Sequence, residues 1–405
     1  MNIFVVNSGS SSIKYQLFKM PSPSPICSGL VERIGLENSI ITHKVYTNGQ
    51  EAVYQQTLNL PDHEAGLQEV RRLLADKEIG VIQNPDDIQV VGHRVVHGGE
   101  SFAATTEVTE EVKAEIKKLI SLAPLHNPAN LLGIEVAEKI FTQARQVVVF
   151  DTAFHQTLPE KAFRYALPES FYTEHRIRVY GFHGTSHKYV AEQTSQYLEK
   201  PEAKIITIHL GNGCSMAAIA EGRAIDTSMG FGPLSGLIMG TRTGDIDASV
   251  VFHLVNQLGY SAAEVNNLFN KQSGMLGLTG HSDMRDIIKA IEAGDKAAAL
   301  AYDMYAYRIK KYIGAYAAVL NGLDAIVFTA GVGENDALVR EMVCRNLDYL
   351  GIRLDADNNK IRAKGIREIN VPDARVKILI VPTNEELEIA QQCYELLTVP
   401  SNKSV

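Results

Sequence analysis

The sequence predicts an α/β protein built from two related domains, and a repeated pattern carries this prediction. Apolar strand-like stretches at 3–6 and 204–210 each run into a turn rich in Gly, Ser and Asn. Each turn is followed by a second strand-like stretch, at 13–18 and at 216–222. Because the same pattern recurs half a chain apart, we expect two duplicated domains whose hairpin turns face a shared cleft. A chance similarity between two hairpins is the alternative.

Length and charge limit the classes of protein to which the chain can belong. The chain has 405 residues, enough for two or three domains, and its 45% hydrophobic content provides for a large core. A net charge of −8 argues against nucleic acid or an anionic membrane as a partner. No apolar run approaches ~18 residues, and no basic stretch followed by an apolar one opens the chain. The four cysteines show no metal-site spacing, so we expect reduced thiols in a cytoplasmic protein.

The first half of the chain reads as mixed α/β. Strands, a hairpin turn and helices are all expected after the first hairpin. They comprise strands at 26–34 and 40–47, the turn TNGQ at 47–50, helices at 62–75 and 109–121, and strands at 88–92 and 146–150.

Three segments of the second half predict further elements. The stretch 284–320 is rich in Ala and Tyr at helical spacing, which predicts one long buried helix. Residues 324–347 read as a strand, a glycine turn and a helix. Residues 377–397 read as a strand, a turn and a C-terminal helix that Thr383 or Asn384 caps.

Glycine-rich turns at strand ends suggest phosphate binding. In NSGSSSIK (7–14) small residues let backbone N–H groups approach a phosphate, and Lys14 adds a charge, although a plain hairpin turn is the alternative. HLGNGCS (209–215) has the same features. GVGEN (331–335) suits a nucleotide at a helix N-terminus, but Asp336 replaces the third glycine of a dinucleotide fingerprint. Three such turns together indicate a nucleotide cleft.

Two arginines stand among glycines and small residues, Arg94 in HRVVHGGE and Arg242 in GTRTGDID. An arginine on a surface helix is usually only solvated. An arginine in a glycine-rich loop is more often an anion clamp, because its planar fork matches a carboxylate or a phosphate. We therefore expect both side chains to bind anions.

Two carboxylates occupy positions where acids bind metals or protons. Asp151 ends the buried strand VVVF, where it could hold a metal or a proton, or cap the next turn. Glu385 starts the C-terminal helix, where capping and Mg²⁺ ligation are both open. Arginines, a lysine, a histidine and Mg²⁺ together suit phosphoryl transfer, since they offset the negative charge of the transferred group.

Three histidines allow more than one interpretation. His183 and His187 in FHGTSH are spaced as a metal pair, but Gly184 and Thr185 between them argue against a regular helix. A hydrogen-bonding or charge-stabilising histidine is the favoured interpretation. His126, in a loop before a helix, is equally open.

Nine motifs in this order resemble those of the acetokinase family, the acetate kinases of the sugar-kinase, Hsp70 and actin superfamily. The resemblance covers residues 2–397 and rests on NSGSSSIKY, HRVVHGGE, APLHNP, FDTAFH, GFHGTSH, HLGNGCS, SMGFGPLSGLIMGTRTGDID, TAGVGEN and PTNEEL.

The resemblance implies two duplicated ribonuclease-H-like (actin-like ATPase) domains around a nucleotide cleft. Residues 1–150 would form the first domain, with a C-terminal helix at about 385–400 packed back on it, and 151–384 the second, which binds nucleotide and joins a homodimer. The implied activity is reversible, Mg²⁺-dependent transfer of the ATP γ-phosphoryl to acetate, giving acetyl phosphate and ADP, in acetyl-CoA biosynthesis. Mn²⁺ would be able to replace Mg²⁺.

Matched position by position, the resemblance also implies roles for single residues. Asp151 would be the active-site acid, His183 and Arg242 would stabilise the transition state, and Arg94 would bind the substrate. The remaining positions divide into metal ligands (Asn7, Glu385), substrate contacts (Val96, Leu125, His126, Phe182, Pro233) and ATP contacts (Ser10, Ser12, Lys14, His209, Leu210, Gly211, Asn212, Gly213, Asp283, Met284, Arg285, Gly331, Val332, Gly333, Glu334, Asn335).

Acetate is already an anion at neutral pH, so its attack on phosphorus needs no general base. Asp151 is therefore expected to position Mg²⁺ through water, or an arginine. Val96, bulkier than alanine, favours acetate over propionate in a pocket where one methylene is worth ~1–3 kcal/mol. A propionate kinase is the alternative, and the arginines argue against a non-enzymatic ATP switch of the actin or Hsp70 type.

Overall fold

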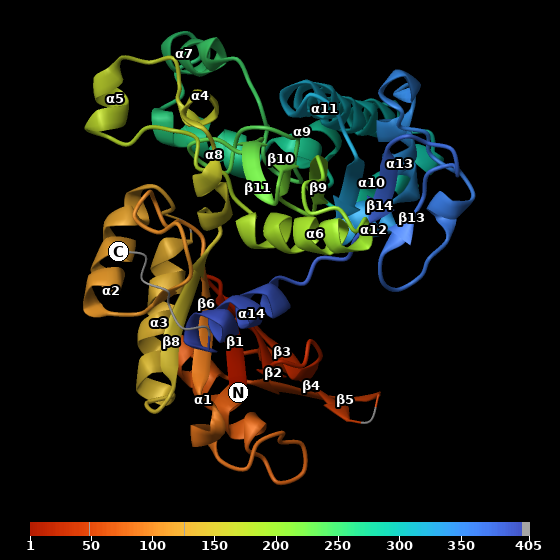
Figure 1. Ribbon diagram of the computed structural model, residues 1–405. Helices are drawn as coiled ribbons and strands as arrows, with labels where there is room; N and C mark the ends of the chain where they lie inside the picture. The colour runs from red at the N-terminus through yellow and green to blue at the C-terminus, as the bar shows by residue number, and fades with distance from the viewer. Residues whose placement is uncertain (48, 125, 399–405) are drawn as a thin grey trace, which may run out of the picture. The chain divides into compact units, whose positions relative to one another are not determined.

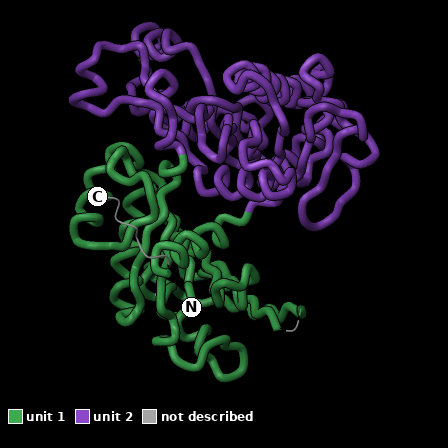
Figure 2. The backbone as a smooth tube through the Cα atoms, in the orientation of Figure 1, with its two compact units in different colours: residues 1–154, 384–405 green, residues 155–383 purple. Residues whose placement is uncertain are grey.

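The computed structural model describes residues 1–47, 49–124 and 126–398. The chain divides into two compact units, which Figure 2 shows in green and purple. Unit 1 combines Met1–Phe154 with the C-terminal segment from Asn384, and unit 2 spans His155–Thr383.

The described part of unit 1 contains an eight-stranded sheet with the order β5-β4-β3-β2-β1-β6-β8-β7 (Figure 1). Strands β1 to β5 are antiparallel neighbours, whereas β6 runs parallel to β1 and β8 runs parallel to β6. The strand bounds are β1 (Asn2–Ser8), β2 (Ser12–Lys19), β3 (Pro25–Glu32), β4 (Ser39–Thr47), β5 (Gln50–Leu58), β6 (Val90–Val95), β7 (Thr106–Glu107) and β8 (Arg145–Phe150).

The hairpins of unit 1 follow from local sequence. β1 is buried at most positions, β2 largely alternates buried and less buried side chains, and the Gly9 N–H donates to Ser12 O across their turn. The β4–β5 pairing places Thr47 opposite Gln50, so the hairpin predicted at TNGQ is confirmed, with Asn48 outside the described residues.

Helices cover both faces of the unit 1 sheet. On one face Phe4 and Val6 share a core with Leu67 of α1. On the other face α14 packs against β1 and β6, so closely that a Cβ on Gly92 would lie 2.9 Å from Cys393 Sγ. The bounds are α1 (His63–Leu74), α2 (Glu110–Lys118), α3 (Asn127–Ile140) and α14 (Glu385–Thr398), with 3-10 turns at Pro85–Asp87, Leu119–Ser121 and Ala153–Thr157.

The described part of unit 2 repeats this plan with a six-stranded sheet of order β11-β10-β9-β12-β14-β13. β9, β10 and β11 form an antiparallel meander, and β12 and β14 follow in parallel beside β9. The order matches β3-β2-β1-β6-β8 of unit 1, which confirms the predicted duplication. The bounds are β9 (Ile205–Leu210), β10 (Cys214–Ala220), β11 (Arg223–Thr227), β12 (Ala325–Thr329), β13 (Arg367–Glu368) and β14 (Lys377–Ile380).

Helices also flank the unit 2 sheet, α6 against β9 and β12 and α11 against β10 and β9. The helix bounds are α4 (Glu160–Phe163), α5 (Glu169–Thr173), α6 (Gly184–Tyr197), α7 (Ala248–Asn256), α8 (Ala262–Lys271), α9 (Gly274–Thr279), α10 (Met284–Glu292), α11 (Lys296–Leu320), α12 (Ala330–Asn335) and α13 (Ala337–Cys344), with 3-10 turns at Asp348–Leu350 and Asn358–Lys360. Across the described ranges, no helix has the length and apolar character that a bilayer crossing requires.

Two predictions for the second half are wrong. The single helix expected over 284–320 is two helices, because Gly294 adopts φ +90° and Asp295 caps the new helix α11 with its carboxylate. The glycine turn expected at GVGEN is itself the short helix α12, which begins directly after β12. Asn384 Oδ1 accepts the Leu387 N–H, so the cap predicted for the C-terminal helix is confirmed.

Candidate active site

In unit 1 the predicted site residues gather at one edge of the sheet. The carboxyl ends of the parallel strands β1, β6 and β8 meet there, as in other α/β sites. Asn7 lies near the end of β1, Arg94 near the end of β6, and Asp151 follows β8 directly. Lys14 is the cross-strand partner of Asn7, so both side chains are on one face of the sheet.

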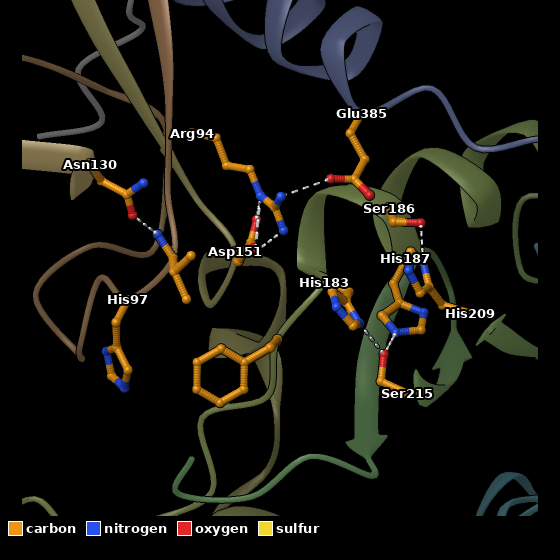
Figure 3. Close-up of polar contacts among 12 residues, drawn as sticks. Arg94, His97, Asn130, Asp151, His183, Ser186, His187, His209, Ser215 and Glu385 are labelled. Carbon is orange, nitrogen blue, oxygen red and sulfur yellow. Dashed lines mark hydrogen bonds and ion pairs between the residues drawn. The ribbon is translucent and has the colours of Figure 1, made fainter. Parts of the chain in front are cut away.

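Arg94 and Asp151 form a two-pronged ion pair (Figure 3). Arg94 Nε lies 3.0 Å from Asp151 Oδ1, and Arg94 Nη2 lies 2.6 Å from Oδ2. Arg94 Nη1 is also 3.6 Å from Glu385 Oε2. Burial opposes the charge of Arg94, but the two carboxylates outweigh it and raise the Arg94 pKa. The prediction that Arg94 lies in a loop is wrong, because the residue belongs to strand β6, which fixes its backbone.

Two acidic residues open helix α14 and contact cations on the strands. Glu385 approaches Arg94, and Glu386 Oε1 lies 2.5 Å from Lys14 Nζ. Carboxylates are stabilised at a helix N-terminus by the exposed backbone N–H groups. Glu386, buried except for 7% of its surface, was missed by the sequence reasoning, although it adjoins the predicted Glu385.

The donor set of this edge suits an Mg²⁺ ion that also takes water and substrate phosphates as ligands. Asn7 and Glu385 offer amide and carboxylate oxygens, which Mg²⁺ prefers. No group of three His, Cys, Asp or Glu side chains able to hold a metal occurs within the residues covered by the structure. Mg²⁺ typically takes one or two carboxylates and completes its shell with water and substrate phosphates, so the residues present fit such an ion.

Helix α3 fixes the loop that follows Arg94. Asn130 Oδ1 accepts the Val96 N–H at 3.1 Å, and Asn130 Nδ2 donates to Ser8 O, so one amide ties this loop to the end of β1. Asn127 holds the backbone of His97 in the same way. Both asparagines are buried and were missed, though polar residues on the buried side of a predicted helix are a usable signal.

The other unit 1 positions lie around these elements. His126 is the residue before the first turn of α3. Ser10 is exposed in the β1–β2 turn, and Ser12 begins β2. The prediction for Leu125 concerns a residue outside the described ranges.

In unit 2, His183 and Arg242 converge on the turn between β9 and β10. A Cβ built on Gly213 would lie 3.5 Å from His183 Nε2 and 3.7 Å from Arg242 Nη1. Arg242 Nη1 also donates to Pro233 O at 3.0 Å, and burial lowers the pKa of Arg242. The two side chains therefore present donors to the space above a glycine, where a phosphate oxygen could approach the backbone.

The start of α6 sets the position of His183. This residue has φ +54°, a left-handed conformation that is uncommon outside glycine, and α6 begins at Gly184. The expectation that Gly184 and Thr185 prevent a regular helix is wrong, because both belong to its first turn. Phe182, the preceding residue, is buried.

Hydroxyl groups connect the histidines of unit 2. Ser215 Oγ lies 2.9 Å from His183 Nδ1 and 2.7 Å from His187 Nε2 (Figure 3). The rings of His183 and His209 stack with centroids 4.2 Å apart, and His209 Nδ1 contacts Ser186 Oγ at 2.8 Å. Hydroxyls thus engage one nitrogen of His183 and both nitrogens of His187, which disfavours the metal pair considered for FHGTSH.

Unit 2 also contains a cavity of about 870 Å³. Nine predicted nucleotide positions line it: Gly211, Asn212, Asp283, Met284, Arg285, Gly331, Val332, Glu334 and Asn335. His209, Leu210, Gly213 and Gly333 do not line it but lie within two positions of residues that do. Its size is within the ~300–1,000 Å³ typical of small-molecule sites.

Cations that the sequence reasoning missed line the same cavity: Arg340, Lys360, Arg362 and Arg367. Arg340 is buried, and its guanidinium donates to Asn359 and to Gly333 O. Burial and the charge of Arg367 lower the Arg340 pKa to about 10, which still leaves it charged at neutral pH. These cations make the cavity suitable for an anionic ligand in a protein of net negative charge.

Comparisons with known proteins agree with these features. A model described as the acetokinase family matches residues 2–391. An acetate kinase of Flavobacterium johnsoniae is 59% identical over 397 residues, 98% of this chain and 100% of that protein. An acetate kinase structure from Porphyromonas gingivalis superimposes with a TM-score of 0.91 at 45% identity, covering 98% of this chain and 99% of that one. A propionate kinase structure from Francisella tularensis superimposes with a TM-score of 0.88 at 40% identity, covering 96% of this chain and 98% of that one. The predicted fold class is confirmed.

Proposed function

Because the chain belongs to the acetokinase family and is a phosphotransferase, we propose that it transfers the γ-phosphoryl of ATP to acetate. The products are acetyl phosphate and ADP, and the reaction is reversible. The observation that carries the proposal is the convergence of His183 and Arg242 on Gly213, next to Gly211 and Asn212 of the nucleotide-sized cavity. This combination suits the charge that develops on a transferred phosphoryl group.

ATP binding is assigned to the cavity of unit 2. Its volume of about 870 Å³ accommodates a nucleotide, and its wall combines glycines with cations. Asn212 is held against Gly240 by the Gly240 N–H, which donates to Asn212 O at 3.0 Å. In this proposal the phosphates extend toward Gly213, which has no side chain of its own to obstruct them.

Acetate binding is assigned to Arg94. The guanidinium offsets the repulsion between acetate and the phosphates, and Asp151 holds it in one orientation through two hydrogen bonds. The carboxylate attacks the γ-phosphorus directly, without an acid or base to remove a proton. Asp151 therefore acts on the arginine and not as a general base.

The transferred group is stabilised by His183 and Arg242. Both place ring or guanidinium nitrogens beside Gly213. Ser215 holds the far side of the His183 ring, and Pro233 O holds the Arg242 guanidinium. Donors fixed before the reaction lower the barrier because they need not reorganise as charge develops.

Mg²⁺ is the metal we propose, with Mn²⁺ as a substitute. Asn7 and Glu385 would hold it, in keeping with the oxygen ligands that Mg²⁺ prefers. When bound, the ion neutralises phosphate charge and orients the γ-phosphoryl. Lys14, paired with Glu386, adds a cation at the same edge.

Acetate is proposed over propionate because of Val96. The residue follows Arg94 by two positions and is anchored through its N–H by Asn130. Its branched side chain restricts the room beside Arg94 more than alanine would. Similarity to a propionate kinase keeps the longer acid as the competing substrate.

Unit 2 carries apolar side chains suited to a homodimer. Phe252 of α7 and Leu300 and Tyr307 of α11 are each more than 60% exposed, and the two α11 residues, seven positions apart, share one helix face that suits an interaction site. We propose that the units correspond to the two family domains and that unit 2 joins the dimer.

All four cysteines are unpaired and buried, which supports a cytoplasmic location for the protein. In the cytoplasm acetyl phosphate can supply acetyl-CoA.

The test is an acid chain-length series. Purified protein is incubated with ATP, Mg²⁺ and formate, acetate, propionate or butyrate, and the acyl phosphate is trapped with hydroxylamine. We expect the highest kcat/KM with acetate. A maximum with propionate would identify the competing kinase, and ATP turnover without any acyl hydroxamate would refute the carboxylate-kinase assignment.

A further inference from the structure

Ser215 couples the protonation of two histidine rings. Its Oγ lies 2.9 Å from His183 Nδ1 and 2.7 Å from His187 Nε2, and Figure 3 shows both contacts as dashed lines. A serine hydroxyl has one proton, so it donates to one ring and must accept from the other. One of the two nitrogens therefore carries a proton and the other a lone pair. The tautomer of His183 depends on that of His187.

His187 is uncharged at neutral pH and continues the chain of contacts. It is fully buried, and burial lowers its pKa well below the usual value, an effect that His155 and His209 reinforce. A neutral imidazole has one donor and one acceptor nitrogen. Its Nδ1 lies 2.7 Å from Thr207 Oγ1. The order of contacts is thus Thr207, His187, Ser215, His183.

The strands explain why these side chains meet. Thr207 and His209 are two positions apart on β9, so both side chains lie on the face covered by α6. Ser215 of β10 is the cross-strand partner of His209. His183 and His187 stand one helical turn apart, with the His187 N–H donating to His183 O at 2.9 Å. The series of contacts is therefore built on a sheet and a helix, which hold it rigidly.

We propose that Thr207, His187 and Ser215 are positioning residues that keep the proton of neutral His183 on Nε2. Thr207 O–H donates to His187 Nδ1, His187 Nε2–H donates to Ser215 Oγ, and Ser215 O–H donates to His183 Nδ1. If every hydrogen bond ran the other way, His187 Nδ1–H would donate to Thr207 Oγ1, and the Thr207 hydroxyl would have to donate to Ala217 O instead. That oxygen is 3.5 Å away, too distant for a strong hydrogen bond.

The consequence is a donor at the required place. His183 Cε1 and Nε2 would lie 3.4 and 3.5 Å from a Cβ on Gly213, so the Nε2 side of the ring, with its N–H, faces the space assigned to the transferred phosphoryl. Neutral His183 can donate there without becoming an imidazolium next to Arg242 and the stacked His209. This inference rests on the proposed phosphoryl-transfer function.

Kinetics of hydroxyl-removing variants test the role. Ser215→Ala should lower kcat about tenfold, the loss of roughly one hydrogen bond, with the KM values for ATP and acetate unchanged. Thr207→Val keeps the shape of the side chain but removes its hydroxyl, which reaches His183 only through His187 and Ser215. It should lower kcat about threefold, and Thr207→Ser should restore kcat. Thr194→Val is the matched control, because this fully buried hydroxyl of α6 donates to Val190 O of its own helix. It should leave kcat unchanged.

Nitrogen NMR of ¹⁵N-histidine-labelled full chain tests the tautomer without reference to turnover. At a pH where His183 is neutral, we expect a protonated Nε2 and an unprotonated Nδ1, and a mixture of tautomers in Ser215→Ala. The opposite tautomer in the unmutated protein, or full kcat in both Ser215→Ala and Thr207→Val, would overturn the inference. Absence of acetyl phosphate with the unmutated protein would instead refute the proposed function.

Discussion

Asp151 holds Arg94 with both oxygens of its carboxylate, although 57 residues separate them in the chain. The Asp151 side chain is 2% exposed and that of Arg94 is 19% exposed, so the pair is largely shielded from water while part of the Arg94 side chain stays accessible. A shielded, two-pronged pair fixes the plane of the guanidinium. The orientation of the proposed acetate-binding group therefore depends on Asp151.

Asp151→Asn should raise the KM for acetate about 10- to 100-fold, since hydrogen bonds between charged groups contribute ~1.5–3 kcal/mol. An amide retains one acceptor oxygen but loses the charge that orients Arg94. The KM for ATP should change little. Initial rates over a range of acetate concentrations measure the effect.

Glu107→Gln is the matched control for this change. Glu107 binds Arg145 with the same two-pronged geometry, but both side chains are exposed. An exposed pair contributes little, so neither the kinetics nor the stability should change noticeably. Equal acetate KM values for Asp151→Asn and the unmutated protein would contradict the positioning role.

Glu385 and Glu386 should differ in their link to the metal. Glu385→Gln should raise the Mg²⁺ concentration for half-maximal activity about tenfold, because it removes a proposed ligand. Glu386→Gln removes the partner of Lys14 and should change the KM for ATP while leaving the Mg²⁺ requirement intact. Mg²⁺ titrations at saturating ATP separate them, and an identical shift in both variants would argue against Glu385 as the ligand.

Gly213→Ala should impair phosphate approach without unfolding unit 2. The new methyl would lie 3.4–3.7 Å from His183 and Arg242, which is ordinary contact. The kcat/KM for ATP should fall about tenfold, since the methyl occupies space assigned to a phosphate oxygen. Gly314→Ala in α11 meets open space and should leave kinetics unchanged. Full activity of Gly213→Ala would remove this turn from the phosphate site.

Val96→Ala should raise the ratio of propionate to acetate kcat/KM about tenfold, because one methylene is worth ~1–3 kcal/mol in an apolar pocket. Val108→Ala, another partly buried valine of unit 1, should leave the ratio unchanged. Rates with the two acids measure both variants, and an unaltered ratio in Val96→Ala would exclude Val96 from acid selection.

Buried histidines should make the fold sensitive to acid. Burial lowers the pKa values of His93, His97 and His155 to about 4, against ~6.5 in the unfolded chain. The unfolded chain therefore binds protons that the folded chain excludes, and the free energy of unfolding falls as pH falls from about 6.5 to about 4. Each histidine contributes ~1.4 kcal/mol per pH unit within this window.

His93→Gln isolates one of these groups. His93 Nε2 donates to Gln146 Oε1, and a glutamine amide can replace that bond without titrating. Urea midpoints at pH 7 and pH 5 should differ less for His93→Gln than for the unmutated chain, whatever the absolute stability. The same pH dependence in both would show that His93 does not titrate as proposed.

Local patterns made much of the fold predictable. The hairpins β1–β2 and β9–β10 follow from short apolar stretches and the turn residues between them, all within about twenty positions, and the repeat between the hairpins indicated the duplication. The break at Gly294 was missed because the Ala- and Tyr-rich spacing continues on both sides of it. The helix at GVGEN was missed because glycines usually indicate turns.

The sequence allowed us to predict which residues belong to the candidate site, but not which of them contact one another. Arg94, Asp151 and Glu385 were each singled out, yet their pairing depends on where three strand ends and a C-terminal helix meet. Ser215 lay within a predicted motif, but its place between two histidine rings depends on how α6 packs on β9. Such contacts arise from tertiary packing, which one sequence does not encode as a local pattern.

Oxygen labelling tests the central claim most directly. The full chain is incubated with ATP, Mg²⁺ and acetate carrying ¹⁸O in both carboxylate positions. Hydroxylamine then cleaves the product at its carbonyl carbon, and the released phosphate is analysed by mass spectrometry. Direct attack of the acetate carboxylate on the γ-phosphorus predicts phosphate with a single ¹⁸O, in the same amount as ADP. Phosphate without ¹⁸O would contradict that attack.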